Sequence, residues 1–292
     1  MSDPVAIPHL FVFGLGYSAN AFAAVLRESG TRISATCRSA EKQAALIAQG
    51  IDAHVFDRDH PLDNAGRAAL DQASHLLSSV PPDDQGDPVV DLHAQDILKA
   101  APFDWIGYLS TTGVYGDCDG DWVDETAPMA PSGTRGQRRV DAEAAWFALA
   151  PAGPVHSFRL AGIYGPGRSA LDTVRQGRAR RVVKPGQVFS RIHIDDITNI
   201  LLASAARPNP GAAYNCCDDE AAPPQDVITY ACDLLGVTPP PEIPFEEADL
   251  SPMAKSFYRD NKRVSNKRIK EELGVTLRWP NYRDALTAML SS

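Results

Sequence analysis

The segment LFVFGLGYSANAF, residues 10–22, decides the fold, because it joins an apolar run to a glycine-rich turn and a helical pattern. LFVFG is typical of a buried strand, and helical spacing follows as far as Gly30. Between them Gly14, Leu15, Gly16, Tyr17, Ser18 and Ala19 form the pattern GxGxxA. Such glycines allow a tight turn and a close approach of backbone to a pyrophosphate at the helix N-terminus. The pattern predicts a dinucleotide-binding turn, with a purely structural glycine turn as the alternative.

Strand and helix patterns alternate along the first half of the chain. We expect strands at 10–14, 33–37, 52–56, 75–80, 105–110 and 155–161, and helices at 18–30, 40–50, 89–100 and 134–146. Alternation at this spacing implies right-handed crossovers and a parallel sheet. The predicted fold class is therefore α/β, a doubly wound sheet of the Rossmann type.

The pattern loosens beyond residue 165. Prolines cluster at 239–244, and basic helical segments follow near 262–270. We expect an NAD(P)-binding domain over residues 1–164, to which a strand near 193–217 returns. Residues 165–192 and 218–292 are expected to form a small substrate lobe.

The composition excludes several classes of protein. A net charge of −9 over 292 residues argues against a nucleic-acid partner, which would need a basic surface. No apolar run approaches the roughly 18 residues of a membrane span, and the acidic N-terminus is unlike a signal peptide. Five cysteines without a CxxC pattern predict reduced thiols in the cytoplasm. The histidines show no HExxH pattern, so we expect no metal site.

The end of the second predicted strand bears on the choice of cofactor. A carboxylate about 20 residues after the glycines would bind the ribose of NAD, but Arg38 lies there, 22 residues after the second glycine. Arginine can pair with a 2′-phosphate, so Arg38 and Ser39 favour NADP(H); a solvated Arg38 with bound NAD is the alternative. Asp57 is a candidate acceptor for the adenine amino group or a simple strand-end cap. Val80 and Leu160, at the ends of further predicted strands, complete the expected cofactor contacts.

Four further segments carry a family resemblance. They are LSTTGVYGD (109–117), FRLAGIYGPGR (158–168), RIHIDDI (191–197) and GAAYNCCDDE (211–220). They resemble, in order, the SxxxVYG, RxxxxYGPG, IHVDD and YNV segments of the extended short-chain dehydrogenases/reductases, which include nucleotide-sugar epimerases and dehydratases. The sequence looks most like the small, atypical, epimerase-like bacterial members. The resemblance implies an NAD(P)-dependent oxidoreductase or epimerase-like activity on a small anionic substrate such as a nucleotide sugar.

The family's chemistry uses a Ser or Thr, a Tyr as acid/base, and a Lys four residues after the Tyr. The resemblance assigns the first role to Thr111, four residues before Tyr115 of the VYG segment. The Tyr–Lys helix usually has the form YxxxKxxxE. Counting back from Glu143 places Arg139 at the Lys position and Arg135 at the Tyr position.

An arginine at the position of the family's catalytic Tyr leaves three hypotheses. A guanidinium does not release its proton, so Arg135 cannot be the general base, whereas Arg139 can still donate to ribose hydroxyls. Proton transfer has moved to Tyr115 or Tyr164, or the protein is a non-catalytic NAD(P)-binding sensor or scaffold, or the helix register is shifted. Both tyrosines have core packing as their alternative role. Arg191 and Tyr164 are expected to contact substrate.

The segment TRGQRRVDAEAAW, residues 134–146, contains these arginines. Thr134 and Gln137 match a capping box, which would make Arg135 the first helical residue. Cations at the positive end of a helix are unfavourable, and bound anions would offset that cost. A surface ion pair between Arg139 and Glu143 is an alternative for one arginine. Family members often pair through helices near 90–100 and 136–149, so a homodimer is one expectation.

Overall fold

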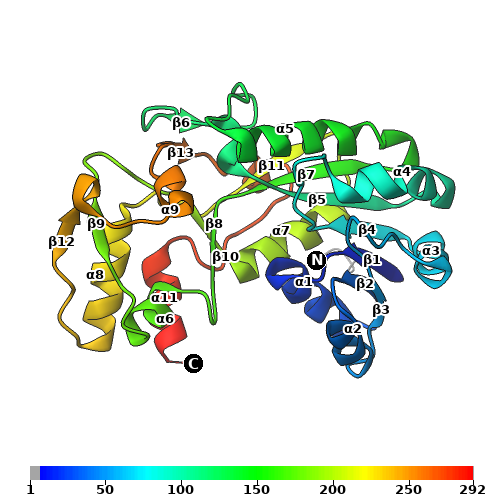
Figure 1. Ribbon diagram of the computed structural model, residues 1–292, viewed down its shortest axis with the longest axis horizontal. Coiled ribbons are helices and arrows are strands. Elements are labelled where there is room, and N and C mark those ends of the chain that lie inside the picture. The colour runs from blue at the N-terminus through cyan, green and yellow to red at the C-terminus, as the bar shows by residue number, and fades with distance from the viewer. Residues whose placement is uncertain (1–6, 292) are drawn as a thin grey trace. The chain divides into compact units, whose positions relative to one another are not determined.

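The computed structural model describes residues 7–291 (Figure 1); the acidic start of the chain lies outside them. The chain divides into two compact units, each built from three stretches of sequence. The first unit contains the residues up to Thr111, Gln137–Arg159 and Thr198–Tyr214; the second contains Thr112–Gly136, Leu160–Ile197 and the residues from Asn215.

A seven-stranded sheet organises the first unit. Its strands are β1 (His9–Phe13), β2 (Arg32–Cys37), β3 (Asp52–Val55), β4 (His75–Ser78), β5 (Trp105–Thr111), β7 (Val155–Leu160) and β11 (Ala213–Cys216). They lie in the order β11-β7-β5-β4-β1-β2-β3, and the ladders from β5 to β3 are parallel. The predicted Rossmann-type sheet is confirmed, with β1 between β4 and β2.

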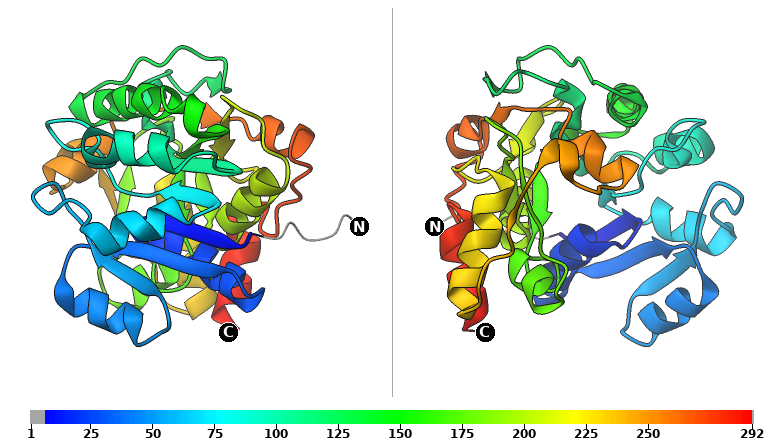
Figure 2. Two further views of the ribbon diagram at one scale, coloured as in Figure 1. Left: turned by 90° about the vertical axis from the view of Figure 1, so that its right-hand side faces the viewer. Right: turned by 60° about the vertical axis from the view of Figure 1, so that its left-hand side comes forward.

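Helices cover both faces of this sheet (Figures 1 and 2). They are α1 (Tyr17–Glu28), α2 (Ala40–Ile47), α3 (Asn64–Asp71), α4 (Pro88–Ala100), α5 (Thr134–Phe147) and α7 (Ile194–Ala206). Phe22 of α1 and Ser204 of α7 both contact Trp105, so these helices share one face. On the opposite face, Trp146 of α5 stacks on Tyr108 with ring centroids 5.7 Å apart.

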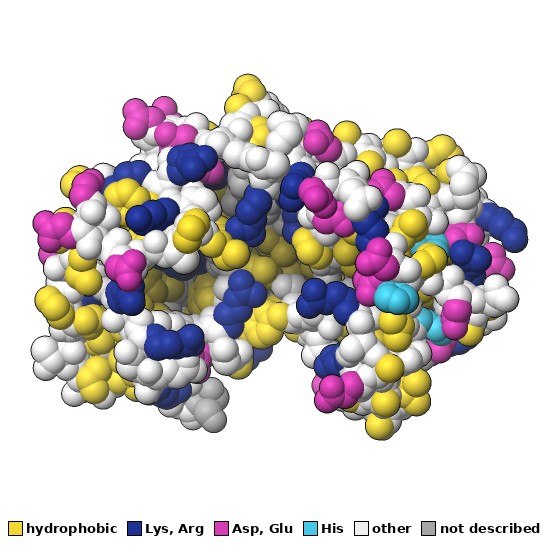
Figure 3. All heavy atoms as spheres, in the orientation of Figure 1, with side chains coloured by type: hydrophobic (Ala, Val, Ile, Leu, Met, Phe, Trp, Pro, Cys, Tyr) yellow, Lys and Arg dark blue, Asp and Glu magenta, His cyan; other side chains and the backbone are white. Residues whose placement is uncertain are grey.

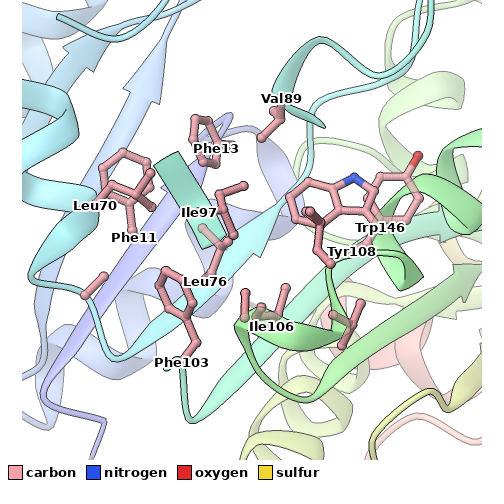
Figure 4. Packing of buried hydrophobic residues seen from close by; sticks show 14 of the residues in the cluster. Phe11, Phe13, Leu70, Leu76, Val89, Ile97, Phe103, Ile106, Tyr108 and Trp146 are labelled. Carbon is pink, nitrogen blue, oxygen red and sulfur yellow. The ribbon is translucent and has the colours of Figure 1, made fainter. Parts of the chain in front are cut away.

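The core between the sheet and helices α3, α4 and α5 is shown in Figure 4. It includes Phe11, Phe13, Leu70, Leu76, Val89, Ile97, Phe103, Ile106, Tyr108 and Trp146. One carboxyl group is built into it: Asp87 caps α4 by accepting from Val89 N at 2.9 Å, and it accepts from Trp146 Nε1 at 3.0 Å. Desolvation raises the pKa of Asp87. The indole hydrogen bond therefore ties α5 to the start of α4.

One helix of the first unit was missed by the sequence analysis, and the start of another differs from the predicted cap. Helix α3 was not predicted; Asp63 begins it by accepting from Gly66 N at 2.8 Å. Helix α5 begins at Thr134, and the Gln137 side chain donates to Asp141 Oδ1 at 2.9 Å, along the helix rather than back toward its start.

The second unit is built from short elements. Its strands are β6 (Trp122–Val123), β8 (Gly162–Tyr164), β9 (Arg181–Val183), β10 (Arg191–His193), β12 (Glu242–Pro244) and β13 (Arg263–Val264), and its helices are α6 (Ala170–Arg175), α8 (Pro224–Leu235), α9 (Pro252–Phe257), α10 (Lys267–Glu271) and α11 (Tyr282–Leu290). The strands pair in parallel as β10-β8, β12-β9 and β13-β6. A core that includes Leu171, Val227 and Leu286 joins α6, α8 and α11.

Candidate functional site

The glycine turn between β1 and α1 is tied to the neighbouring strands by hydrogen bonds. Gly14 N donates to Thr36 Oγ1 at 2.8 Å, and Leu15 N donates to Thr36 O at 3.0 Å. The Ser79 hydroxyl donates to Gly14 O. The turn is therefore held by residues of β2 and by the residue after β4, at the carboxyl ends of the parallel strands, where ligands bind in open α/β sheets.

The two glycines of the turn differ in what the fold requires of them. Gly14 has φ +81°, and a Cβ there would lie 3.0 Å from Val80 Cγ2, so backbone conformation and packing both require glycine. Gly16 has φ −87°, an ordinary value, and a Cβ there would meet no protein atom nearer than Ser79 Oγ at 3.9 Å. The fold accounts for Gly14 and does not account for Gly16.

The N-terminus of α1 has the electrostatics of an anion site. Gly16 is its N-cap and supplies no side-chain cap, and the first turn contains no acidic residue. Ser18 and Ala19 are buried under the turn, whereas Tyr17 is exposed. The positive end of a 12-residue helix is thus left without a carboxylate from its own sequence.

The residues predicted to contact the adenosine half lie nearby in the same unit. Arg38 is exposed directly after β2, and the Ser39 hydroxyl caps α2 by accepting from Lys42 N at 3.2 Å. Asp57 Oδ1 accepts from two following backbone N–H groups and lies 2.8 Å from His60 Nδ1. Desolvation raises the pKa of Asp57, but these hydrogen bonds outweigh it and lower the pKa overall. Asp57 thus orders its own loop, and its contact with adenine stays a prediction. The cofactor contact predicted for Leu160, which is buried at the end of β7 and is counted with the second unit, stays a prediction too.

Helix α5 supplies a buried ion pair that the sequence analysis did not foresee. Glu143 is 1% exposed and accepts from Arg159 at 2.9–3.2 Å. Arg139 turns instead to β5, donating to Leu109 O at 2.7 Å and to Tyr108 OH at 3.2 Å. The surface ion pair between Arg139 and Glu143 is therefore wrong. Thr111 is the last residue of β5 and is half-buried.

The second unit holds the position assigned to the missing tyrosine. Arg135 is exposed, and its guanidinium carbon lies 5.9 Å from the centre of the Phe257 ring. Tyr115 is buried, and its hydroxyl donates to Asn215 Oδ1 at 2.7 Å. The Asn215 backbone N–H in turn donates to Glu125 Oε1 at 2.7 Å. The Tyr115 hydroxyl thus belongs to a core hydrogen-bond chain, and its part in proton transfer stays a prediction.

Tyr164 and Arg191, the two predicted substrate contacts, lie together in the second unit. Both line a cavity of about 500 Å³. The Tyr164 hydroxyl is buried and finds no hydrogen-bond partner among the described residues, and desolvation raises the pKa of Tyr164 far above its usual value. Arg191 Nη1 donates to Phe189 O at 2.7 Å and to Ala222 O at 3.0 Å. Desolvation lowers the pKa of Arg191.

Two titratable residues were not singled out from the sequence. Asp218 is 3% exposed, and desolvation raises its pKa to about 8. Lys262 Nζ donates at 2.6 Å to the carbonyl of Gly116 in the VYG segment and lies 3.6 Å from Asp260 Oδ2; desolvation lowers the pKa of Lys262. Asp218 falls within the quoted YNCCDDE stretch, but a sequence does not reveal which of adjacent acids is buried.

Within residues 7–291, no His, Cys, Asp and Glu side chains gather in threes as metal ligands would. The helices of the same residues include none with the length and hydropathy to cross a membrane.

The chain is similar to known proteins over more than nine-tenths of its length. No family model matches it. A solved structure of a conserved protein of unknown function from Silicibacter pomeroyi DSS is 51% identical, with a TM-score of 0.90 over 97% of this chain and 98% of that chain. The chain belongs to the same family as this Silicibacter protein. Protein YeeZ of Escherichia coli K12 is 27% identical over 281 residues, which are 92% of this chain and 96% of YeeZ.

A more distant structure shares the fold. MoeE5 in complex with UDP-glucose and NAD is 19% identical and has a TM-score of 0.76 over 97% of each chain. A structure of a putative NAD-dependent epimerase/dehydratase from Methylobacillus flagellatus is 23% identical, with a TM-score of 0.68 over 98% of each chain. At these identities the two likenesses establish the fold alone.

Proposed function

We propose that the protein binds a nicotinamide dinucleotide at the Gly14–Ala19 turn. Gly16 is the observation that carries this proposal. Neither its φ of −87° nor any protein atom closer than 3.9 Å to a Cβ explains a glycine there. A pyrophosphate lying against the backbone does explain it, because a side chain would keep the phosphate oxygens from the N–H groups. MoeE5, which shares the fold, carries NAD in its complex.

The surrounding residues fit such a ligand. The uncapped N-terminus of α1 offers backbone N–H groups and a positive dipole to the phosphates. The exposed Arg38 after β2 favours the 2′-phosphate of NADP, because a guanidinium pairs with phosphate through two hydrogen bonds. Val80 lies against Gly14 and offers an apolar contact beside the turn.

We further propose an oxidoreductase or epimerase-like reaction on a small anionic substrate. The dinucleotide would exchange a hydride with a substrate carbon. Thr111 at the end of β5 would donate a hydrogen bond to the reacting oxygen, and Arg139, held by Leu109 O and Tyr108 OH, would keep a fixed cation beside that strand end. The hydroxyl proton released on oxidation would pass to solvent water, because the guanidinium of Arg135 is already protonated and cannot accept it.

The state of the two tyrosines favours a second candidate function. The Tyr115 hydroxyl is engaged by Asn215, and the raised pKa of Tyr164 makes that hydroxyl a donor rather than a base. If neither tyrosine accepts the proton, a chain with a dinucleotide turn would act as a non-catalytic NAD(P)-binding sensor or scaffold. A homodimer and a cytoplasmic location stay predictions beside either function.

Calorimetric titration with NADPH and NADH tests the binding step. We expect sub-millimolar binding, tighter for NADPH, and we expect Arg38→Glu to weaken NADPH more than NADH. No binding of either dinucleotide at millimolar concentration would reject the proposal, and an equal loss of both in the variant would reject the role of Arg38.

Nicotinamide absorbance in the presence of UDP-glucose, the ligand held by MoeE5, separates the two candidate functions. A substrate-dependent change that Thr111→Ala abolishes establishes the enzyme. Binding without such a change, for UDP-glucose and a panel of related nucleotide sugars, supports the sensor or scaffold.

A further inference from the structure

The loops that follow β3 and β4 lie on either side of the glycine turn along the edge of the sheet. The strand order is β4-β1-β2-β3, so the glycine turn after β1 and Arg38 after β2 come between the two loops. Each loop has a predicted cofactor contact two residues after its strand, Asp57 after β3 and Val80 after β4. A ligand on the ends of β1 and β2 would therefore lie between these two loops.

One side chain joins the two loops. Arg58, the residue after Asp57, donates to both carboxylate oxygens of Asp83, from Nε at 2.5 Å and from Nη2 at 2.9 Å. The same Nη2 donates to Asp91 Oδ2 at 2.8 Å, in the first turn of α4. Arg58 thus ties the loop after β3 both to the loop after β4 and to the helix that follows it.

Each loop also makes a turn of its own, which acts within that loop. The Asp57 carboxylate accepts from two backbone N–H groups that follow it in the chain. The Asp83 carboxylate accepts from Gln85 N at 2.8 Å, and it bonds Arg58 as well. These turns fix the conformation of each loop, whereas the bridge from Arg58 fixes the separation between the loops.

The charges around Arg58 favour a cation at this position. It bonds Asp83 and Asp91, and it lies between Asp57 and Asp59 in the chain. Figure 3 shows acidic, basic and His side chains gathered over the region of β3, β4 and α3, on the right of the view. The hydrogen bond from Arg58 holds the pKa of Asp83 below its usual range. The Arg58 side chain is 18% exposed, and a bidentate, partly buried pair is stronger than an exposed one.

We propose that Arg58 is a positioning residue of the dinucleotide site, which holds Asp57 and Val80 at the separation that the adenosine half of the ligand requires. Val80 is placed by its packing against Gly14 of the turn. The place of Asp57 relative to Val80 depends on the bridge from Arg58 to Asp83. In this role Arg58 acts through the loops and does not itself touch the ligand. The inference rests on the proposed dinucleotide function and adds to it a residue outside the glycine pattern.

Calorimetric titration with NADPH over a double-mutant cycle tests this role on the full chain. Arg58→Gln and Asp83→Asn are each expected to weaken binding by at least about fivefold, because the ligand would then have to order the loops itself. The double variant should lose little more affinity than either single variant, since both changes break the same bridge. Losses that multiply would show that the two residues act independently, which would overturn the positioning role.

Arg58→Lys keeps the charge but lacks the planar fork that bonds Asp83 twice. It should bind NADPH more weakly than the unaltered protein and more tightly than Arg58→Gln. Thermal unfolding shows which variants are folded at the temperature of the titration, and Arg58→Lys carries the test if Arg58→Gln is not. Full affinity in a folded Arg58→Gln or, where that variant is unfolded, in Arg58→Lys would overturn the proposal.

Arg67→Gln is the matched control. Arg67 is an exposed arginine of α3 in the same unit, and it pairs with Asp96 of α4 rather than with either loop. This variant should bind NADPH within twofold of the unaltered protein. A loss equal to that of Arg58→Gln would show that any lost ion pair of this unit weakens binding, and would overturn a special role for Arg58.

Titration of the unaltered protein keeps the proposal apart from the proposed function. If it binds no NADPH at millimolar concentration, the dinucleotide site fails, and the role of Arg58 fails with it. If the unaltered protein and a folded Arg58→Gln bind NADPH equally well, the dinucleotide site stands and only the role of Arg58 fails.

Discussion

The turn at Gly14–Ala19 was predicted to bind the cofactor and helix α5 to carry the family's catalytic positions, yet the fold explains the residues of the two segments to different degrees. In the turn, the fold requires Gly14 through its φ of +81° and does not account for Gly16. In α5, Glu143 is engaged by Arg159, and Arg139 by the carbonyl of Leu109. The turn thus contains a glycine that neither backbone conformation nor packing requires, whereas two of the three family positions in α5 already have structural partners.

The difference separates two kinds of motif residue. A motif position filled by a residue that the fold needs tells little about activity, because folding alone would keep it. A position whose residue type has no internal cause points to a ligand. Arg135 belongs clearly to neither kind. Its guanidinium lies beside the Phe257 ring, but the residue is exposed and its charge is unfavourable at the positive end of the helix.

The largest expected effect is that of Glu143→Gln. Arg159 is buried, and neutralising its partner leaves an uncompensated charge in the core, which costs roughly 3–5 kcal/mol of unfolding free energy. Denaturant unfolding measures the loss, with the exposed Asp141→Asn on the same helix as the control, expected within about 0.5 kcal/mol. A loss below about 1 kcal/mol for Glu143→Gln would show that the Glu143–Arg159 pair contributes little to stability and would contradict a structural role for Glu143.

Asp218 is a carboxyl group whose burial is only partly compensated, because its Oδ2 atom has no hydrogen-bond partner among the described residues. Its pKa of about 8 in the folded chain lies far above the ordinary carboxyl value. Between about pH 4 and 8 the native state therefore keeps a proton that the unfolded chain has lost, so stability falls as the pH rises. We expect Asp218→Asn to make this fall shallower. The gain in unfolding free energy of the variant over the unaltered protein should be larger at pH 8 than at pH 5, by an amount of the order of a few kcal/mol.

Thermal unfolding of both proteins from pH 5 to pH 8 measures the effect. The exposed Asp141→Asn should keep the slope of the unaltered protein. A parallel decline for Asp218→Asn would show that its carboxyl titrates normally.

Gly14→Ala is expected to have an intermediate effect. A side chain at φ +81° is strained, and the new Cβ would press on Val80 at 3.0 Å, so about 1–3 kcal/mol of stability should be lost. The shift of the denaturation midpoint measures it. Unchanged stability would contradict the structural requirement that distinguishes Gly14 from Gly16.

The smallest effects concern the arginines of α5. Arg139→Gln loses the hydrogen bond to Leu109 O and should cost about 1 kcal/mol. Arg135→Gln removes an exposed cation from the positive helix end and should raise stability by a few tenths of a kcal/mol. Urea unfolding of the two variants measures both changes in stability. A larger loss of stability for Arg135→Gln than for Arg139→Gln would show that Arg135, and not Arg139, has the structural role.

The sheet of the first unit was predictable because each strand carries its own signal. LFVFG and WIGYLS are apolar runs between turn residues, and the strands β1 and β5 fall on them. Helix α3 was missed because NAGRAALD contains few large apolar residues and depends on the Asp63 cap and on packing of Leu70 in the core. Local sequence patterns therefore predicted the elements whose apolar residues recur with a regular period. They failed for a helix whose formation depends on one cap and one core contact.

The second unit and the site depend on contacts between distant residues. The ladder of β12 on β9 pairs Glu242 with Arg181, and no local pattern reveals such a partner. The partner of Glu143 was sought four residues away on its helix, but it is Arg159 on a strand. The glycine turn could be recognised in the sequence because its pattern is confined to six consecutive residues, whereas the cavity of the second unit is lined by residues from Tyr164 to Leu286.

Calorimetric titration of the Gly16→Ala variant with NADPH and NADH tests the central claim most directly. The variant should unfold at the same midpoint as the unaltered protein, because a Cβ at Gly16 has room, and should bind the dinucleotide at least about tenfold more weakly, a loss of about 1.4 kcal/mol or more. Unchanged dinucleotide affinity in a stable Gly16→Ala protein would contradict a pyrophosphate site at this turn.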